Sequence, residues 1–281
     1  MAETLVITGP TGVRYDVIKP LGKTEQFSMH ACMLPDGQEA ILKIVTDAGD
    51  NDLLDREAFL LKSLHSEALE LEVAYDEVKK KGSKAKLNYQ FAFPQVIESF
   101  VIPEQGDRRA NILSFANICK ELGELVPLEH LRTRAGLRID PRTSAWILGK
   151  LLKIIAFAHN QGIVLGDKIT GENILLNKEE HFVALFDWSG LTATGESVEV
   201  GFVRLDIRAA AEAVITAMGG DFELRKLPVH EDLVDNGYEE FVFNLMNGDY
   251  TSADDAHQEY YKLVRAIWPR GFHTFTAYPV S

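Results

Sequence analysis

This chain of 281 residues has few cysteines, no long apolar run and no secretory signal pattern, and each of these absences argues against a class of protein. Its two cysteines, Cys32 and Cys119, give neither a disulfide framework nor the spacing of a metal site. No apolar run approaches the ~20 residues that a membrane span needs. The N-terminal residues Met1–Thr4 lack the basic start and apolar core of a secretory signal. We therefore expect a protein of the reducing cytoplasm with no membrane partner.

Basic residues are also few, at 29 against 42 acidic ones, which gives a net charge of −13. A protein that binds nucleic acid through bulk electrostatics needs the opposite balance, so we expect no nucleic-acid partner. The hydrophobic share of 46% is enough to bury a full core in one large domain or two lobes.

Residues 1–115 read mainly as β-strands, because apolar and polar residues alternate between turn signals. A helix at Asp52–Leu64 interrupts them, with apolar residues at helical spacing. The segment His65–Lys86 is more polar, and we predict that its lysine-rich end, Lys79–Lys86, is an exposed loop. The expected strands are Tyr15–Leu21, Ser28–Leu34, Glu39–Val45, Val96–Ile102 and Arg109–Phe115.

After a connector near Ala116–Val126 the chain becomes mainly helical. Asp140 followed by Pro141 is a typical helix start, and the apolar helix Pro141–Asn160 follows it. A ligand cleft is expected between the β-rich and helical lobes. The remaining expected elements are a hairpin at Asn173–Leu176 and Phe182–Phe186, and helices at Leu205–Met218, Tyr238–Met246 and Asp254–Ile267.

Two carboxylates and an amide stand near the ends of the short strands. Asp167 and Asn173 lie in one short segment, and Asp187 follows the second strand of the hairpin. Such oxygen ligands are what a protein needs to hold Mg²⁺ beside a phosphoryl group. This trio indicates phosphate chemistry.

The order of these elements, with residues at matching places, resembles the protein kinase fold over nearly the whole chain. Ala40-Ile41-Leu42-Lys43 is similar to the third-strand motif V-A-I-K, and Glu57 stands where a helix glutamate pairs with that lysine. Val164 to Asn173 resembles the catalytic loop H-R-D-x-x-x-x-N, and Phe186-Asp187-Trp188-Ser189 stands at the D-F-G position. Asp206 resembles the aspartate that begins the central helix of the helical lobe.

This resemblance implies an α+β, two-lobed kinase-like domain over residues 1–281. A small antiparallel β lobe with one helix (1–115) would be joined by a connector (116–126) to a mainly helical lobe (127–281). It implies ATP and Mg²⁺ as cofactors and transfer of the γ-phosphoryl group to a hydroxyl acceptor. The implied roles are Asp167 as catalytic base, Lys43 as phosphate ligand held by Glu57, Gly22 and Ser28 as further nucleotide contacts, and Asn173 and Asp187 as metal ligands.

The phosphate-covering loop departs from the kinase pattern. Of G-x-G-x-x-G, the segment Leu21–Ser28 keeps only Gly22, and backbone amides cradle phosphates best where no side chain hinders them. This favours a second interpretation, a pseudokinase that acts as a nucleotide-binding or scaffolding module.

The catalytic segment departs as well. Leu165 and Gly166 replace His-Arg, and Asn173 follows Asp167 by six positions where the motif has five, an insertion that Gly171 could absorb. From Asp187 to Asp206 there is no A-P-E sequence, which leaves little platform for a peptide and keeps a small-molecule acceptor open. The stretch between Phe115 and Asp167 is too short for the helical insert of small-molecule kinases, so a Ser/Thr protein acceptor is favoured.

Overall fold

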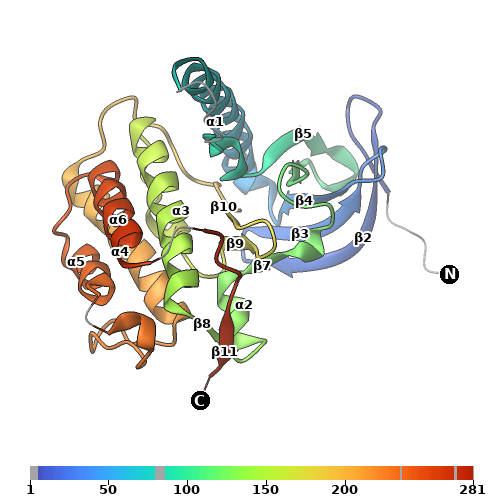
Figure 1. The fold of residues 1–281 in the computed structure, drawn as a ribbon. Coiled ribbons are helices and arrows are strands. Elements are labelled where there is room, and N and C mark those ends of the chain that lie inside the picture. The colour runs from blue at the N-terminus through green and yellow to red at the C-terminus, as the bar shows by residue number, and fades with distance from the viewer. Residues whose placement is uncertain (1–5, 80–85, 235, 269–270, 281) are drawn as a thin grey trace. The chain divides into compact units, whose positions relative to one another are not determined.

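The computed structural model describes residues 6–79, 86–234, 236–268 and 271–280. The chain divides into two compact units (Figure 1). Met1–Leu125 and the short segment Trp188–Thr192 form the first unit, and Val126–Asp187 with Ala193–Ser281 forms the second. The return of 188–192 to the first unit is a feature that the sequence did not indicate.

The first unit contains a six-stranded antiparallel sheet in the order β1-β2-β3-β4-β6-β5, the curled blue-to-green arrows of Figure 1. Short 3₁₀ turns lie at Ala48–Asp50, Tyr89–Phe91, Pro103–Gln105 and Leu122–Glu124. The strands are β1 (Val6–Thr8), β2 (Arg14–Lys23), β3 (Phe27–Met33), β4 (Glu39–Val45), β5 (Gln95–Ile102) and β6 (Arg108–Ser114).

Side chains alternate across β4 and give the sheet two different faces. Ala40, Leu42 and Ile44 lie in one apolar cluster with residues of β1, β2, β5 and β6. Val45 points to the other face, where it packs with Phe27 of β3 and Leu54 of the following helix. The same alternation turns Lys43 toward that helix.

That helix, α1, spans Asn51–Val78 and is longer than expected. The prediction that it ends at Leu64 was wrong, because the more polar stretch from His65 continues the helix to Val78. The stretch 65–78 holds no glycine or proline and is rich in Ala, Leu and Glu, so helix propensity prevails over the weaker apolar periodicity. Of the predicted loop Lys79–Lys86, residues 80–85 lie outside the described part of the chain.

The second unit is mainly helical and is built on α3 (Pro141–Asn160). Asp140 caps this helix, because its Oδ1 accepts a hydrogen bond of 2.7 Å from the N–H of Thr143. The helix expected at Leu205–Met218 is α4, and it begins five residues earlier, at Val200. The other helices are α2 (Leu128–Thr133), α4 (Val200–Ala217), α5 (Tyr238–Asn247) and α6 (Ala253–Ile267), with 3₁₀ turns at Gly166–Lys168 and Glu231–Leu233.

Two small sheets complete this part of the chain. The expected hairpin pairs β9 (Ile174–Asn177) with β10 (Phe182–Leu185), and β7 (Leu125–Pro127) joins β9. A second pair, β8 (Leu137–Ile139) and β11 (Ala277–Pro279), was not indicated by the sequence. Among the residues described, no helix combines the length and apolar character that crossing a membrane requires.

Candidate functional site

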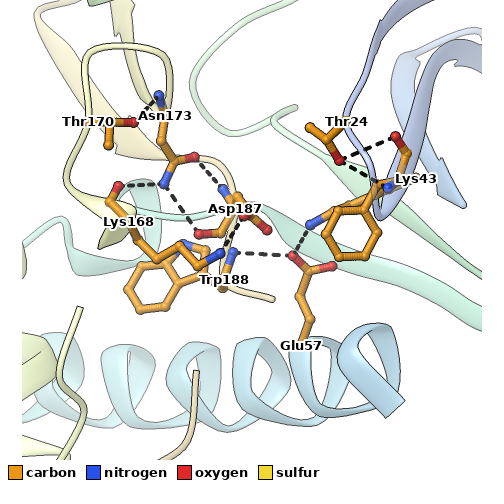
Figure 2. A network of polar contacts seen from close by, with 9 residues as sticks. Thr24, Lys43, Glu57, Lys168, Thr170, Asn173, Asp187 and Trp188 are labelled. Carbon is orange, nitrogen blue, oxygen red and sulfur yellow. Dashed lines mark hydrogen bonds and ion pairs between the residues drawn. The ribbon is translucent and has the colours of Figure 1, made fainter. Parts of the chain in front are cut away.

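Lys43 and Glu57 form a buried ion pair in the first unit (Figure 2). The distance from Lys43 Nζ to Glu57 Oε1 is 2.6 Å, and the two side chains are 1% and 0% exposed. Asn111, the β6 partner of Lys43, donates its amide to Glu57 Oε2 at 3.0 Å. A buried charge pair is tolerated only when it is well paired and hydrogen-bonded, and this pair is both.

Phe27 covers the ammonium group of Lys43. Lys43 Nζ lies 4.4 Å from the centroid of the Phe27 ring, a cation–π distance. Phe27 is itself buried, packed with Val45 and Leu54. With a glutamate on one side and an aromatic ring on another, Lys43 is closed to solvent in this arrangement.

The turn before Phe27 uses its own backbone donors. The N–H of Thr24 donates to the carbonyl of Phe27 at 2.8 Å, and the N–H of Phe27 donates to Thr24 Oγ1 at 3.0 Å. Two amides that a phosphate-covering loop would offer to a ligand are therefore engaged within the turn. The predicted nucleotide contacts Gly22 and Ser28 flank it, Gly22 exposed and Ser28 half-buried, and they pair with Met29 and Lys23 between β2 and β3.

The ion pair also holds the backbone next to Asp187. The N–H of Trp188 donates to Glu57 Oε1 at 3.2 Å, and the Trp188 ring is fully buried against Phe93. Trp188 belongs to the first unit and Asp187 to the second. The peptide bond between them therefore links the Lys43–Glu57 pair to the predicted metal ligand.

In the second unit, Asp206 of α4 fixes the segment before Asp167. This carboxylate is fully buried and accepts hydrogen bonds of 2.8 Å from the backbone N–H groups of Leu165 and Gly166. His159 Nε2 lies 2.9 Å from Oδ2, the oxygen that also accepts from Leu165. Three partners satisfy a buried charge that would otherwise be costly.

Gly166 takes a backbone conformation that favours glycine over arginine there. Its φ is +55°, in the left-handed region where a Cβ costs free energy. No atom lies within 4 Å of the place where a Cβ would stand, so backbone strain rather than space favours glycine.

Asn173 clamps two stretches of backbone. Its Nδ2 donates to the carbonyl of Lys168 at 2.7 Å, and its Oδ1 accepts from the N–H of Asp187 at 2.6 Å (Figure 2). The extra residue of this loop lies against α2, since the N–H of Glu129 donates to the Gly171 carbonyl at 2.9 Å. An added Cβ on Gly171 would come within 3.0 Å of Glu129 Cβ, so this close approach requires glycine.

Asp187 faces a cation from its own unit. Lys168 Nζ lies 2.7 Å from Asp187 Oδ2, and the two side chains are 17% and 25% exposed (Figure 2). Asp167, the neighbour of Lys168, is exposed, and among the described residues its carboxylate has no hydrogen-bond or ion-pair partner. The residue of this loop that reaches Asp187 is therefore a lysine.

The structure thus places the predicted site residues in two groups. Lys43 and Glu57 meet in the first unit, while Asn173 and Asp187 meet in the second, with Asp167 on the same loop. Phe27 and Lys168 were missed by sequence reasoning. The position of Phe27 at the third glycine of G-x-G-x-x-G was the available signal for one, and the extra residue after Asp167 was the signal for the other.

Few side chains at this site could coordinate Mg²⁺. No group of three or more His, Cys, Asp or Glu side chains converges within the described residues. Magnesium usually takes one or two carboxylates, with water and substrate phosphates supplying the rest. Asp187 fits that role once Lys168 moves aside, and Asn173 Oδ1 keeps a second lone pair beside its bond to Asp187.

Comparison of the chain with known proteins shows likeness in structure alone. No protein-family model and no curated protein sequence matches it. The structure of vaccinia related kinase 3 matches with a TM-score of 0.61 and 14% identity, covering 95% of this chain and 92% of that one. A double mutant of the Mycobacterium tuberculosis PknI kinase domain matches with a TM-score of 0.55 and 12% identity, covering 94% and 99%. The chain therefore has a protein kinase-like fold, of the mixed α+β type expected from its sequence.

Proposed function

We propose that the chain is a phosphotransferase of the protein kinase-like type, which uses ATP and Mg²⁺ and transfers the γ-phosphoryl group to a hydroxyl acceptor. The observation that carries this proposal is the buried Lys43–Glu57 pair, whose glutamate also holds the backbone beside Asp187. A buried pair is weak evidence for stability, because an apolar pair often serves as well. A phosphate-binding role explains why two charged side chains, rather than apolar ones, occupy this buried position.

Each residue has a task in this proposal. Lys43 would bind the α/β-phosphates, and Glu57 would keep its ammonium in place. Asp187, with Asn173 beside it, would hold the magnesium ion, which would neutralise the negative charge of the phosphates. Asp167 would orient the acceptor hydroxyl and accept its proton, a role that its exposed carboxylate permits.

In this proposal two side chains must move before ligands can bind. The Phe27 ring must leave Lys43 before phosphates can reach its ammonium, and Lys168 must release Asp187 before a metal can bind there. A serine or threonine hydroxyl of a protein is the favoured acceptor.

A second candidate function is a non-catalytic module that keeps the kinase fold for binding or scaffolding. The Lys168–Asp187 contact favours it, because the metal-binding carboxylate already has an internal cation. The covered Lys43 adds to this, since its ammonium is closed to solvent.

ATP turnover separates the two candidates. ADP release and protein phosphorylation would be measured with Mg²⁺ and a set of Ser/Thr peptides, for the native chain and for Asp167→Asn. The proposal predicts turnover that falls by at least about 100-fold in the variant, the usual weight of a general base. A native chain that binds Mg²⁺–ATP but gives no phosphorylation of itself or of any peptide, and no ADP, would contradict the enzyme and support the module.

A further inference from the structure

A cavity with aromatic and polar walls in the second unit lies away from the residues discussed above. It has a volume of about 370 Å³ and sits between the first turns of α3, the β9–β10 turn, α6 and the segment after it. Cavities that bind small molecules begin near this size. Its walls include Arg142, Trp146, His181, Tyr260, Trp268 and Phe272.

Three of these wall residues carry a buried nitrogen atom with no hydrogen-bond partner. The atoms are Arg142 Nε, Trp146 Nε1 and His181 Nε2. The first two can only donate, and the third donates or accepts according to its tautomer. Buried polar groups are nearly always satisfied in folded proteins, so three unsatisfied ones on one cavity indicate a missing acceptor.

The local structure brings these three side chains to one cavity. Arg142 and Trp146 are four residues apart on α3 and share one face of the helix. The His181 ring stacks on Trp146, with centroids 4.6 Å apart and planes 5° from parallel. Phe272 stacks on the other face of His181 at 4.1 Å, and the φ of His181 is +54°, which few non-glycine residues adopt.

The charge around the cavity favours an anion. Arg142 Nη2 lies 3.2 Å from Asp232 Oδ1, while the Nε of the same side chain has no partner. The next turn of α3 adds Lys150, whose ammonium lies 6.0 Å from the Phe182 ring, and its pKa is lowered by burial. Burial, and then the charges of His273 and Lys150, lower the pKa of His181. Of the acidic groups nearby, Asp140 is paired with His273 and Glu179 is exposed.

We propose that this cavity binds a small aromatic acid, a flat ring bearing a carboxylate or phosphate. The oxyanion would accept hydrogen bonds from Arg142 and Trp146, and from His181 in its Nε2–H form, while the aromatic walls would contact the ring. The site is independent of ATP binding and of catalysis. Arg142, Trp146 and His181 have no part in the proposed phosphotransfer.

Arg138 provides a matched comparison within the same unit. Its Nε is also buried and without a partner. The cavity beside it, however, measures about 10 Å³, which is at most the space of one water molecule. An unsatisfied arginine alone therefore does not make a binding site. Arg142 differs from Arg138 because it lines a large aromatic cavity.

The test uses phenyl phosphate and benzoate as probes. The chain has three tryptophans, so the indole N–H region of a ¹⁵N spectrum is simple, and Trp146→Phe assigns the signal of interest. We expect both probes to shift the Trp146 signal with saturation at millimolar concentration, while benzylamine leaves it unchanged. The pKa of His181 should rise in the complex, because an anion opposes the nearby positive charges.

Variants locate the site by calorimetry. Arg142→Gln and Trp146→Phe should each weaken phenyl phosphate binding by about 5-fold or more, the effect of losing one charged or buried hydrogen bond. Arg138→Gln should bind as the native chain does, and unchanged urea midpoints would show that the variants fold. Absence of a saturable shift at millimolar probe, or equal weakening in Arg138→Gln, would overturn the proposal. Equal shifts with inorganic phosphate and chloride would mean an adventitious ion only, and would overturn it too.

Discussion

The ammonium of Lys168 lies 2.7 Å from Oδ2 of Asp187, so the carboxylate expected to carry a metal ion is already paired with a cation of its own unit. Both side chains are mostly buried, at 17% and 25% exposed, and solvent screens the contact only in part. Any divalent ion that binds Asp187 must compete with this lysine.

Replacing Lys168 tests that competition. We expect Lys168→Met to strengthen Mg²⁺–ATP binding by several-fold if the lysine only blocks Asp187, since the pair is worth at most about 1–2 kcal/mol at this exposure. Calorimetric titration of native and variant chains measures the difference, with Lys120→Met, a change in the first unit, as control. Weaker binding in Lys168→Met would mean that its ammonium contacts the phosphates instead.

The Lys43–Glu57 pair predicts that the losses of stability caused by replacing each residue are far from additive. Lys43→Met leaves the carboxylate of Glu57 buried without its cation and should destabilise the chain by about 3–5 kcal/mol in urea unfolding. The double variant Lys43→Met with Glu57→Gln removes both charges and should recover most of that loss. Arg56→Met, which breaks an exposed ion pair with Asp52 on the same helix, should cost no more than about 0.5 kcal/mol. Additive losses in the double variant would contradict a mutually dependent pair.

Replacing Gly166 should lower the stability of the chain through backbone conformation alone. Gly166→Ala forces a Cβ on to a backbone with φ of +55° and should destabilise the second unit by about 1 kcal/mol, although the space is open. Gly123→Ala has equally open space and no positive φ, so it should leave the unfolding free energy unchanged or slightly higher. Equal effects of the two substitutions would show that Gly166 is not under conformational strain.

Buried histidines predict a loss of stability in mild acid. Burial is the main cause that lowers the pKa of His65, His181 and His257. Because their folded pKa values lie below the unfolded value of about 6.5, the unfolded chain takes up protons first as the pH falls. The stability contributed by these neutral rings is present above about pH 6.5 and is lost as the pH falls below it. Urea midpoints between about pH 7.5 and about pH 5.5 measure this, and His65→Gln should flatten the dependence.

Much of the fold and part of the site followed from the sequence, for physical reasons. Lys43 and Glu57 lie on a buried strand and the helix after it, where short-range periodicity fixes which faces meet. Asp206 was identified through the resemblance to kinases, and it lies within α4 rather than at the start of that helix as expected. The length of α1 was not, because its second half has helix propensity but few buried residues.

Phe27 and Lys168 escaped prediction because their contacts depend on loop geometry. The ring of Phe27 reaches Lys43 through a tight turn whose hydrogen bonds involve Thr24, which no periodicity encodes. Lys168 reaches Asp187 from the loop between Asp167 and Asn173, where Asn173 holds the carbonyl of Lys168. The sequence does not encode which side chain of such a loop faces Asp187.

The most direct test of the central claim is the thermal stability of the chain with ATP, with and without Mg²⁺, in native form and as Asp187→Asn. Millimolar Mg²⁺–ATP should raise Tm of the native chain, ATP without the metal should raise it less, and Asp187→Asn should abolish the metal-dependent part. Asp36→Asn, in an exposed hairpin turn, should respond as the native chain does. If Mg²⁺–ATP leaves Tm of the native chain unchanged, or raises that of Asp187→Asn equally, the proposed nucleotide and metal site is contradicted.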